Sequence, residues 1–116
     1  MKKRENAPST AESLPRDDEV AILRSSRRRT LLALLTAYDR TLTTNDLTKE
    51  IAVRERDESI TDVPGDVLAR IAISLHHAHI PKLVDAGLVE YDEKRHLVDP
   101  TEKLAHLEPR LSRAAV

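Results

Sequence analysis

The fold of this chain is decided by the stretch Pro81-Lys82-Leu83-Val84-Asp85-Ala86-Gly87-Leu88-Val89-Glu90-Tyr91. Apolar residues recur at helical spacing before it, and after Gly87 they alternate with polar residues, as in a strand. Because proline has no backbone N–H, we expect the helix to kink or restart at Pro81. Glycine readily adopts the left-handed conformation that ends many helices, so we expect the helix to stop at Gly87. The stretch therefore predicts a helix that passes directly into a β-strand.

The period of two continues downstream of this stretch. Leu88, Val89 and Tyr91 indicate one strand, and Leu97–Val98 indicate a second. The polar run between them, Asp92-Glu93-Lys94-Arg95, has the length and composition of a hairpin turn. We therefore predict a β-hairpin over about residues 88–99.

Amphipathic segments precede the hairpin. The apolar residues within 31–38 follow the i, i+3, i+4, i+7 spacing of a helix with one buried face. Leu42–Thr43 suggests a short bridging strand, a second helix should end near Arg56, and a third should cover about residues 65–79. The order helix, helix, helix, hairpin is that of a winged helix-turn-helix domain. We predict a mainly α fold with a small β-hairpin.

The composition is that of one small domain with an aliphatic core. The chain has 116 residues, of which 40% are hydrophobic and only 2% aromatic. Charged residues make up 34%, yet the formal net charge is -1, which leaves room for a local basic face and argues against a uniformly basic protein. No apolar run is long enough to span a membrane, and none follows the basic start to make a signal peptide. We expect a cytoplasmic protein.

The two ends of the chain are expected to differ from the middle. Residues 1–16 are polar and lack periodicity, so they predict a disordered tail, and residues 17–100 then form the domain. Residues 101–116 predict a short helical extension that Pro109 interrupts. The apolar residues at the two ends either pack on the three-helix core or join two copies into a homodimer. They are Val20, Ile22, Leu23, Leu104, Leu107 and Leu111.

The run from Leu75 to Tyr91 resembles the distal half of winged-helix transcription regulators. In that class the recognition helix ends in a leucine, a small residue and a glycine, and continues into the first wing strand. Over about residues 18–99 the chain resembles a functionally uncharacterised winged-helix family common in halophilic archaea, and this likeness implies a regulatory role. The residues that carry it include Arg27-Arg28-Arg29, Leu47 to Ala52, Ile73-Ser74-Leu75, His79-Ile80-Pro81-Lys82-Leu83 and Glu90-Tyr91-Asp92.

The predicted partner is double-stranded DNA. A winged helix places its third helix in the major groove and its wing on the flanking backbone. Arg70 could pair with guanine in a bidentate manner or hold a phosphate, and the wing tip could reach the backbone or the minor groove. The candidate DNA-binding residues are Arg70, Ser74, His77, Lys94, Arg95 and Arg54.

Two features leave alternatives open. Ala69 and Ile73 are expected on the exposed face of the third helix and cannot hydrogen-bond to bases, so a protein–protein adaptor without DNA binding is the alternative function. Arg27–Arg29 begin the first helix, where the helix dipole disfavours positive charge. They either pair with Asp17–Glu19 or make contacts outside their own helix.

Catalysis and metal binding find little support. The chain has no cysteine and only two glycines, so thiol chemistry and a glycine-rich phosphate loop are excluded, and the carboxylates are scattered. His76 and His79 share a helix face, but no clear third ligand lies nearby. We predict no catalytic residue, no metal and no cofactor.

Overall fold

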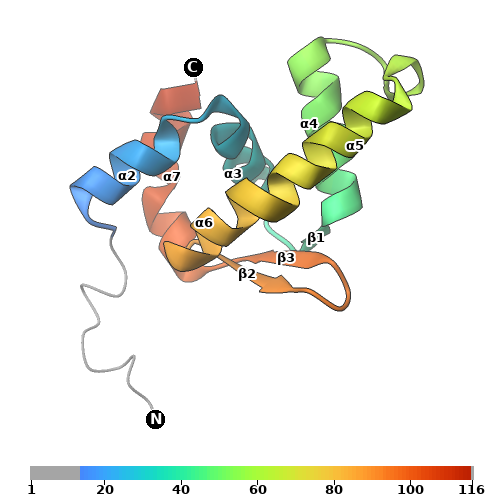
Figure 1. Cartoon of the computed structure of the whole chain (residues 1–116). Helices are drawn as coiled ribbons and strands as arrows, with labels where there is room; N and C mark the ends of the chain where they lie inside the picture. The colour runs from blue at the N-terminus through green and yellow to red at the C-terminus, as the bar shows by residue number, and fades with distance from the viewer. Residues whose placement is uncertain (1–13, 116) are drawn as a thin grey trace.

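The computed structural model describes residues 14–115 and shows helices packed around a small antiparallel sheet (Figure 1). The predicted mainly α fold with a β-hairpin is confirmed. The part of the predicted tail before residue 14 lies outside the described residues, and the first helix already begins at Arg16. In chain order the elements are α2 (Arg16–Leu23), α3 (Ser26–Tyr38), β1 (Leu42–Thr43), α4 (Thr44–Arg56), η2 (Ile60–Asp62), α5 (Gly65–Ser74), η3 (Leu75–His79), α6 (Ile80–Asp85), β2 (Val89–Asp92), β3 (Leu97–Pro100) and α7 (Glu102–Ala115).

Helix α3 lies at the centre of an aliphatic core. Its residues Leu31, Leu32 and Leu35 are completely buried, between α7 on one side and α4 on the other. Helix α4 contributes Leu47 and Ile51, which are also completely buried. Burial of a leucine or isoleucine side chain contributes about 1.5–3 kcal/mol, so these residues supply much of the energy that holds the helices together.

The C-terminal helix runs through its proline, so the predicted interruption at Pro109 is wrong. Helix α7 extends from Glu102 to Ala115. The proline removes one hydrogen bond, to the carbonyl of Ala105. Both residues are exposed, so water can satisfy that carbonyl, while Leu107 and Leu111 on the opposite side are buried against the core.

Most apolar residues of the terminal helices pack within their own chain. Ile22 of α2 and three leucines of α7, at positions 104, 107 and 111, belong to the core, and Leu23 packs against it. Val20 is the large apolar residue of α2 that stays exposed. Packing on the chain's own core therefore accounts for five of the six apolar residues at the two ends.

The hairpin and the short first strand form one sheet in the order β1-β3-β2. Strand β3 pairs with both neighbours, so that Val98 lies opposite Leu42 on one side and Tyr91 on the other. The backbone N–H of Thr44 donates to the carbonyl of His96 (2.9 Å). This bond ties the start of α4 to the end of the hairpin turn.

The junction between α6 and β2 has the glycine stop that the sequence predicts. Gly87 adopts a φ of 77° in the left-handed region. The hydroxyl of Thr101 donates to the Gly87 carbonyl (2.7 Å), and Lys103 Nζ donates to the Ala86 carbonyl (3.0 Å). The start of α7 therefore satisfies carbonyls that the end of α6 leaves free.

The long third helix is irregular next to Pro81, where the sequence predicts a kink or a restart. A new α-helical segment, α6, starts at Ile80 with Pro81 in its first turn, and it follows α5 through one π-helical turn, η3. The N–H of Ile80 donates to the carbonyl of Leu75, five residues earlier. In a regular α-helix the proline ring would collide with the carbonyl of His77. The wider turn just before Pro81 takes up this conflict, and it keeps Leu75 and Ile80 both buried although they are five residues apart.

Candidate nucleic-acid interface

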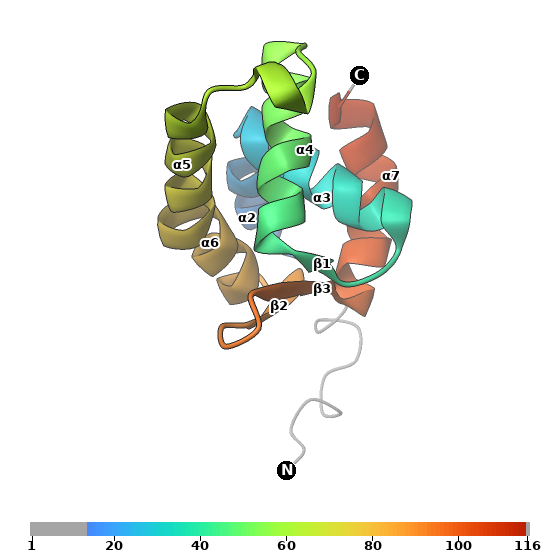
Figure 2. The same ribbon diagram turned by 90° about the vertical axis from the view of Figure 1, so that its right-hand side faces the viewer.

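The outward face of α5 and the turn between β2 and β3 lie on the same side of the molecule. Helix α5 runs across the front in Figure 1 with the hairpin below it, and in Figure 2 α5 and the turn of the hairpin both lie to the left of α4. The inner side of α5 packs on α4. This arrangement leaves one helix face and one hairpin tip open on a common side.

Arg70 lies on the exposed face of α5. Its guanidinium Nη1 is 3.2 Å from Asp66 Oδ2, one helical turn earlier, and its side chain is 69% exposed. An exposed pair of this kind is worth only about 0.3–0.5 kcal/mol. The pair therefore holds Arg70 weakly, and a stronger anion can displace Asp66.

The hairpin tip presents Lys94 and Arg95. Asp92 organises the turn, because one of its carboxylate oxygens accepts the backbone N–H groups of both residues at 3.2 Å. His96 then adopts a φ of 58° to close the turn. Arg95 Nε is 3.9 Å from the other Asp92 oxygen, and the arginine side chain is 77% exposed. Lys94 and Arg95 are therefore both exposed, and the hydrogen bonds to Asp92 hold the backbone that carries them.

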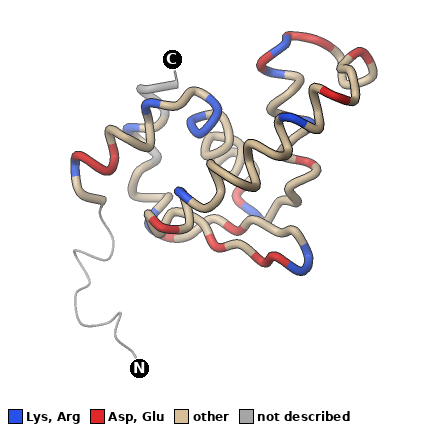
Figure 3. Tube along the Cα trace, in the orientation of Figure 1, with Lys and Arg blue, Asp and Glu red and all other residues tan. Residues whose placement is uncertain are grey.

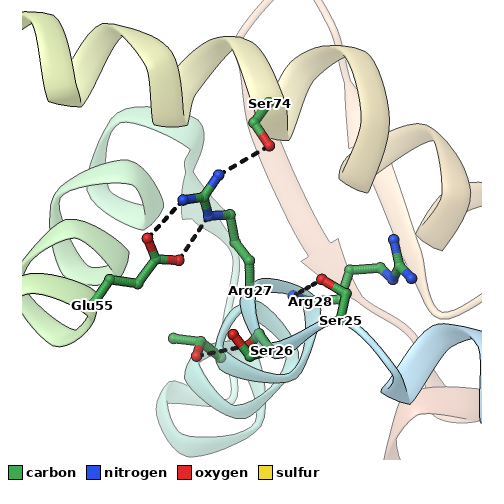
Figure 4. A network of polar contacts seen from close by, with 7 residues as sticks. Ser25, Ser26, Arg27, Arg28, Glu55 and Ser74 are labelled. Carbon is green, nitrogen blue, oxygen red and sulfur yellow. Dashed lines mark hydrogen bonds and ion pairs between the residues drawn. The ribbon is translucent and has the colours of Figure 1, made fainter.

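Ser74 does not face outward with Arg70. It is half-buried, and its hydroxyl accepts a hydrogen bond from Arg27 Nη1 at 3.1 Å (Figure 4). The same guanidinium donates from Nε and Nη2 to the two carboxylate oxygens of Glu55, at 2.7 and 2.6 Å. The hydrogen bond with Glu55 raises the pKa of Arg27 against the opposing effect of burial. Arg27 thus joins α3, α4 and α5, and the prediction that Ser74 contacts bases finds no support in this geometry.

The other arginines at the start of α3 hold α2 in place. Arg28 donates to the carbonyls of Ala21 (2.9 Å) and Ile22 (3.0 Å), and Arg29 donates to that of Leu23 (2.6 Å). Positive groups near the C-terminal carbonyls of a helix are favourable. Of the two alternatives for this arginine triplet, contacts outside its own helix are the ones observed. They are directed to the interior of the protein.

Arg54 lies away from the candidate face. Its Nη1 is 2.5 Å from Glu50 Oε1. The side chain lines an open pocket of about 430 Å³ together with five residues of α3, namely Ser26, Arg29, Thr30, Ala33 and Leu34. The residues that line this pocket belong to α3 and α4, and none of them belongs to α5 or to the hairpin. Arg54 therefore does not join Arg70 on one surface.

The histidines of the π-helical turn connect the helix to the hairpin. His77 is exposed, and its ring meets that of His76 edge-on with centroids 5.0 Å apart. His76 in turn lies 6.3 Å from the ring of Tyr91 in β2, whose hydroxyl is 3.4 Å from His96 Nδ1. Across the described residues, no three His, Cys, Asp or Glu side chains form a metal-binding group. These four rings form a contact between η3 and the β2–β3 hairpin.

His79 differs from the other histidines of the turn because it is half-buried. Its Nδ1 is 3.3 Å from Arg28 Nη1, a contact in which a neutral imidazole accepts the hydrogen bond. Burial lowers the pKa of His79, and the nearby charges of Arg28 and Arg27 lower it further.

Charges of both signs alternate over the candidate face. Figure 3 shows acidic and basic residues following one another along α5 and around the hairpin turn. The face is therefore not uniformly basic. Its exposed positive charge comes from Arg70 on α5 and from Lys94 and Arg95 in the β2–β3 turn.

Comparison with known proteins places the chain in a family. Residues 20–99, more than half of the chain, match the domain of unknown function DUF7344, and the chain belongs to this family. No curated protein matches the sequence, and no solved structure matches the fold. In the part of the chain that the structure describes, no helix is long and apolar enough to cross a membrane.

Proposed function

We propose that this protein is a winged helix-turn-helix regulator that binds double-stranded DNA. The observation that carries the proposal is that α5 and the β2–β3 turn lie on a common side of the molecule (Figure 2). Each of these elements carries an arginine that is more than two-thirds exposed, Arg70 in α5 and Arg95 in the turn. The order α3, β1, α4, α5, β2, β3 and the sheet order β1-β3-β2 support the winged-helix class. In this arrangement α5 enters the major groove and the hairpin contacts the adjacent backbone.

The energies of the local ion pairs favour such binding. Contact with a phosphate requires Arg70 to leave Asp66 and Arg95 to leave Asp92, and both pairs are exposed. Each release costs about 0.5 kcal/mol or less. Charge-assisted hydrogen bonds to phosphate are about twice as strong as neutral ones, and counterion release adds to them. Replacing the aspartate partners of these arginines by phosphates therefore favours DNA binding at low salt.

The proposal extends to the setting of the protein. It is a cytoplasmic transcription regulator of a winged-helix family of halophilic archaea, and it uses no cofactor. Two copies bound to adjacent half-sites would add their contacts. A homodimer joined through the terminal helices has Val20 available as an exposed apolar contact, since the leucines of α7 pack inside the chain.

The test is a salt titration of binding to a short fluorescein-labelled duplex of random sequence, followed by anisotropy. Arg70→Ala combined with Arg95→Ala should weaken binding and lower the salt slope by about one for each phosphate that the variant no longer neutralises. The matched control combines Arg40→Ala with Arg110→Ala, two exposed arginines outside the candidate face, and removes the same charge. Equal effects of the two double variants would refute the assignment of the surface.

A second function has one observation in its favour. Ile73 is 58% exposed on the outward face of α5, and an exposed apolar residue on a helix also suits a protein partner. If the wild-type protein binds no duplex at low salt, the adaptor function replaces the DNA-binding one.

A further inference from the structure

The outward face of α5 is unusual for a helix that reads DNA, because it offers so few hydrogen-bonding groups. The helix contains no asparagine or glutamine, which are the usual partners of adenine. Ser74 is engaged by Arg27, and Arg70 is paired with Asp66. The side chains left on the exposed face are largely apolar, and Ile73 is the largest of them.

The apolar surface of this face has the size of a small chemical group. Ile73 is the only large apolar residue exposed on α5, and alanines at positions 69 and 72 are exposed beside it. Elsewhere in the described residues, the large exposed apolar side chains are scattered over separate elements, namely Val20 in α2, Tyr38 in α3, Ile60 in η2 and Val84 in α6. A stable protein–protein interface buries roughly 800 Å² on each side. One exposed isoleucine, with Arg70 one helical turn before it, fits a smaller target.

We infer that Ile73 recognises the C5-methyl group of thymine in the major groove. This methyl is the apolar feature that the groove presents, and aliphatic side chains contact it directly. Arg70, three residues before Ile73, supplies the charge that a neighbouring phosphate needs. The inference rests on the proposed function and adds its specificity: the protein prefers sites whose pyrimidines carry a 5-methyl group.

The experiment compares duplexes that differ only in that methyl group. A duplex of alternating adenine and thymine is measured beside the same duplex with deoxyuridine in place of thymine. An alternating guanine–cytosine duplex is measured with and without 5-methylcytosine. All four duplexes have the same length and the same number of phosphates, so the contribution of phosphate contacts is equal within each pair. Wild type should bind the methylated member of each pair more tightly, by about fourfold for each methyl covered, because burying one such group is worth about 0.8 kcal/mol.

Two variants assign the effect to a residue. Ile73→Ser removes the aliphatic side chain and should bind methylated and unmethylated duplexes equally, with little change in affinity for the deoxyuridine duplex. Val20→Ser removes a similarly exposed aliphatic side chain from α2 and should keep the full preference. Both positions are exposed, so both variants are expected to fold, and circular dichroism verifies this.

The outcomes separate the inference from the function on which it rests. Equal binding of thymine and deoxyuridine duplexes by the wild type would overturn the inference and leave DNA binding intact. A preference that persists in Ile73→Ser would show that another residue reads the methyl group, which also overturns the inference. Absence of binding to all four duplexes at low salt would overturn the proposed function itself.

Discussion

Replacing Arg27 by methionine should lower the free energy of unfolding by about 2 kcal/mol. The bidentate bond from Arg27 to Glu55 joins α3 to α4, and the third bond reaches Ser74 at the end of α5. An exposed ion pair contributes about 0.2–1 kcal/mol, and breaking a buried one costs about 3–5 kcal/mol. The side chains are 28% and 27% exposed, so this pair lies between the two limits. Methionine keeps the apolar stem and removes the guanidinium.

The assay is a double-mutant cycle of Arg27→Met and Glu55→Gln, measured by urea unfolding. Far-ultraviolet circular dichroism is the suitable signal, because the chain is mainly helical and has no tryptophan. We expect a coupling energy of about 1.5 kcal/mol between the two positions. Arg27→Met alone should lower the melting temperature by roughly 10 °C, at about 4–8 °C per kcal/mol for a domain of this size.

The control is the exposed pair Arg56–Glu58, whose nitrogen and oxygen are 2.9 Å apart and which joins residues two positions apart. Its coupling energy should stay below about 0.5 kcal/mol. If the coupling of Arg27 with Glu55 is equally small, the contact is a surface pair, and the reasoning that it joins the three helices is refuted.

Three further predictions concern other parts of the molecule. Burial and the charge of Arg28 lower the pKa of His79 in the folded state, so the stability that this histidine contributes should be complete above about pH 6.5 and decline as the pH falls below it. The midpoint of urea unfolding, measured across this pH range, should depend less steeply on pH in His79→Gln than in the wild type. An unchanged dependence would contradict the assignment. Asp66→Asn frees Arg70 and removes a negative charge from the candidate face, so it should tighten binding to the random duplex, whereas weaker binding would argue against α5 as the contact helix. Gly87→Ala should destabilise the protein by about 1–2 kcal/mol, because a residue with a side chain is strained at a φ of 77°. The added methyl group meets only the Lys103 side chain, which can move aside, so the cost comes from the backbone. Unchanged stability in urea unfolding would mean that the turn relaxes.

The elements that follow from local spacing could be predicted from the sequence. The change of period after Gly87 located the hairpin, and the leucines of residues 31–38 located the central helix. Both depend only on neighbours along the chain. The course of α7 through Pro109 could not be read in this way, because it depends on the burial of Leu107 and Leu111 against α3.

The candidate site was predictable only in part. Arg70, Lys94 and Arg95 are exposed, as their positions in the helix and the turn suggested. Ser74 and Arg54 have partners within the chain that the sequence did not indicate, because helical spacing gives the direction of a side chain and does not reveal its neighbours. The partner of Ser74 is Arg27, 47 residues away in sequence. Such a contact becomes visible only when the helices are packed.

The π-helical turn at Leu75–His79 holds one residue more than a regular helical turn. The extra residue is taken up inside the turn, so α5 and α6 stay close to the relative angle of a continuous helix. Deleting one residue there would return the turn to the regular α-helical period and leave the direction of Arg70 and Ile73 nearly unchanged. The deletion would also bring the ring of Pro81 against the carbonyl four residues earlier. Related sequences that lack both this residue and the proline would therefore present the same face of α5.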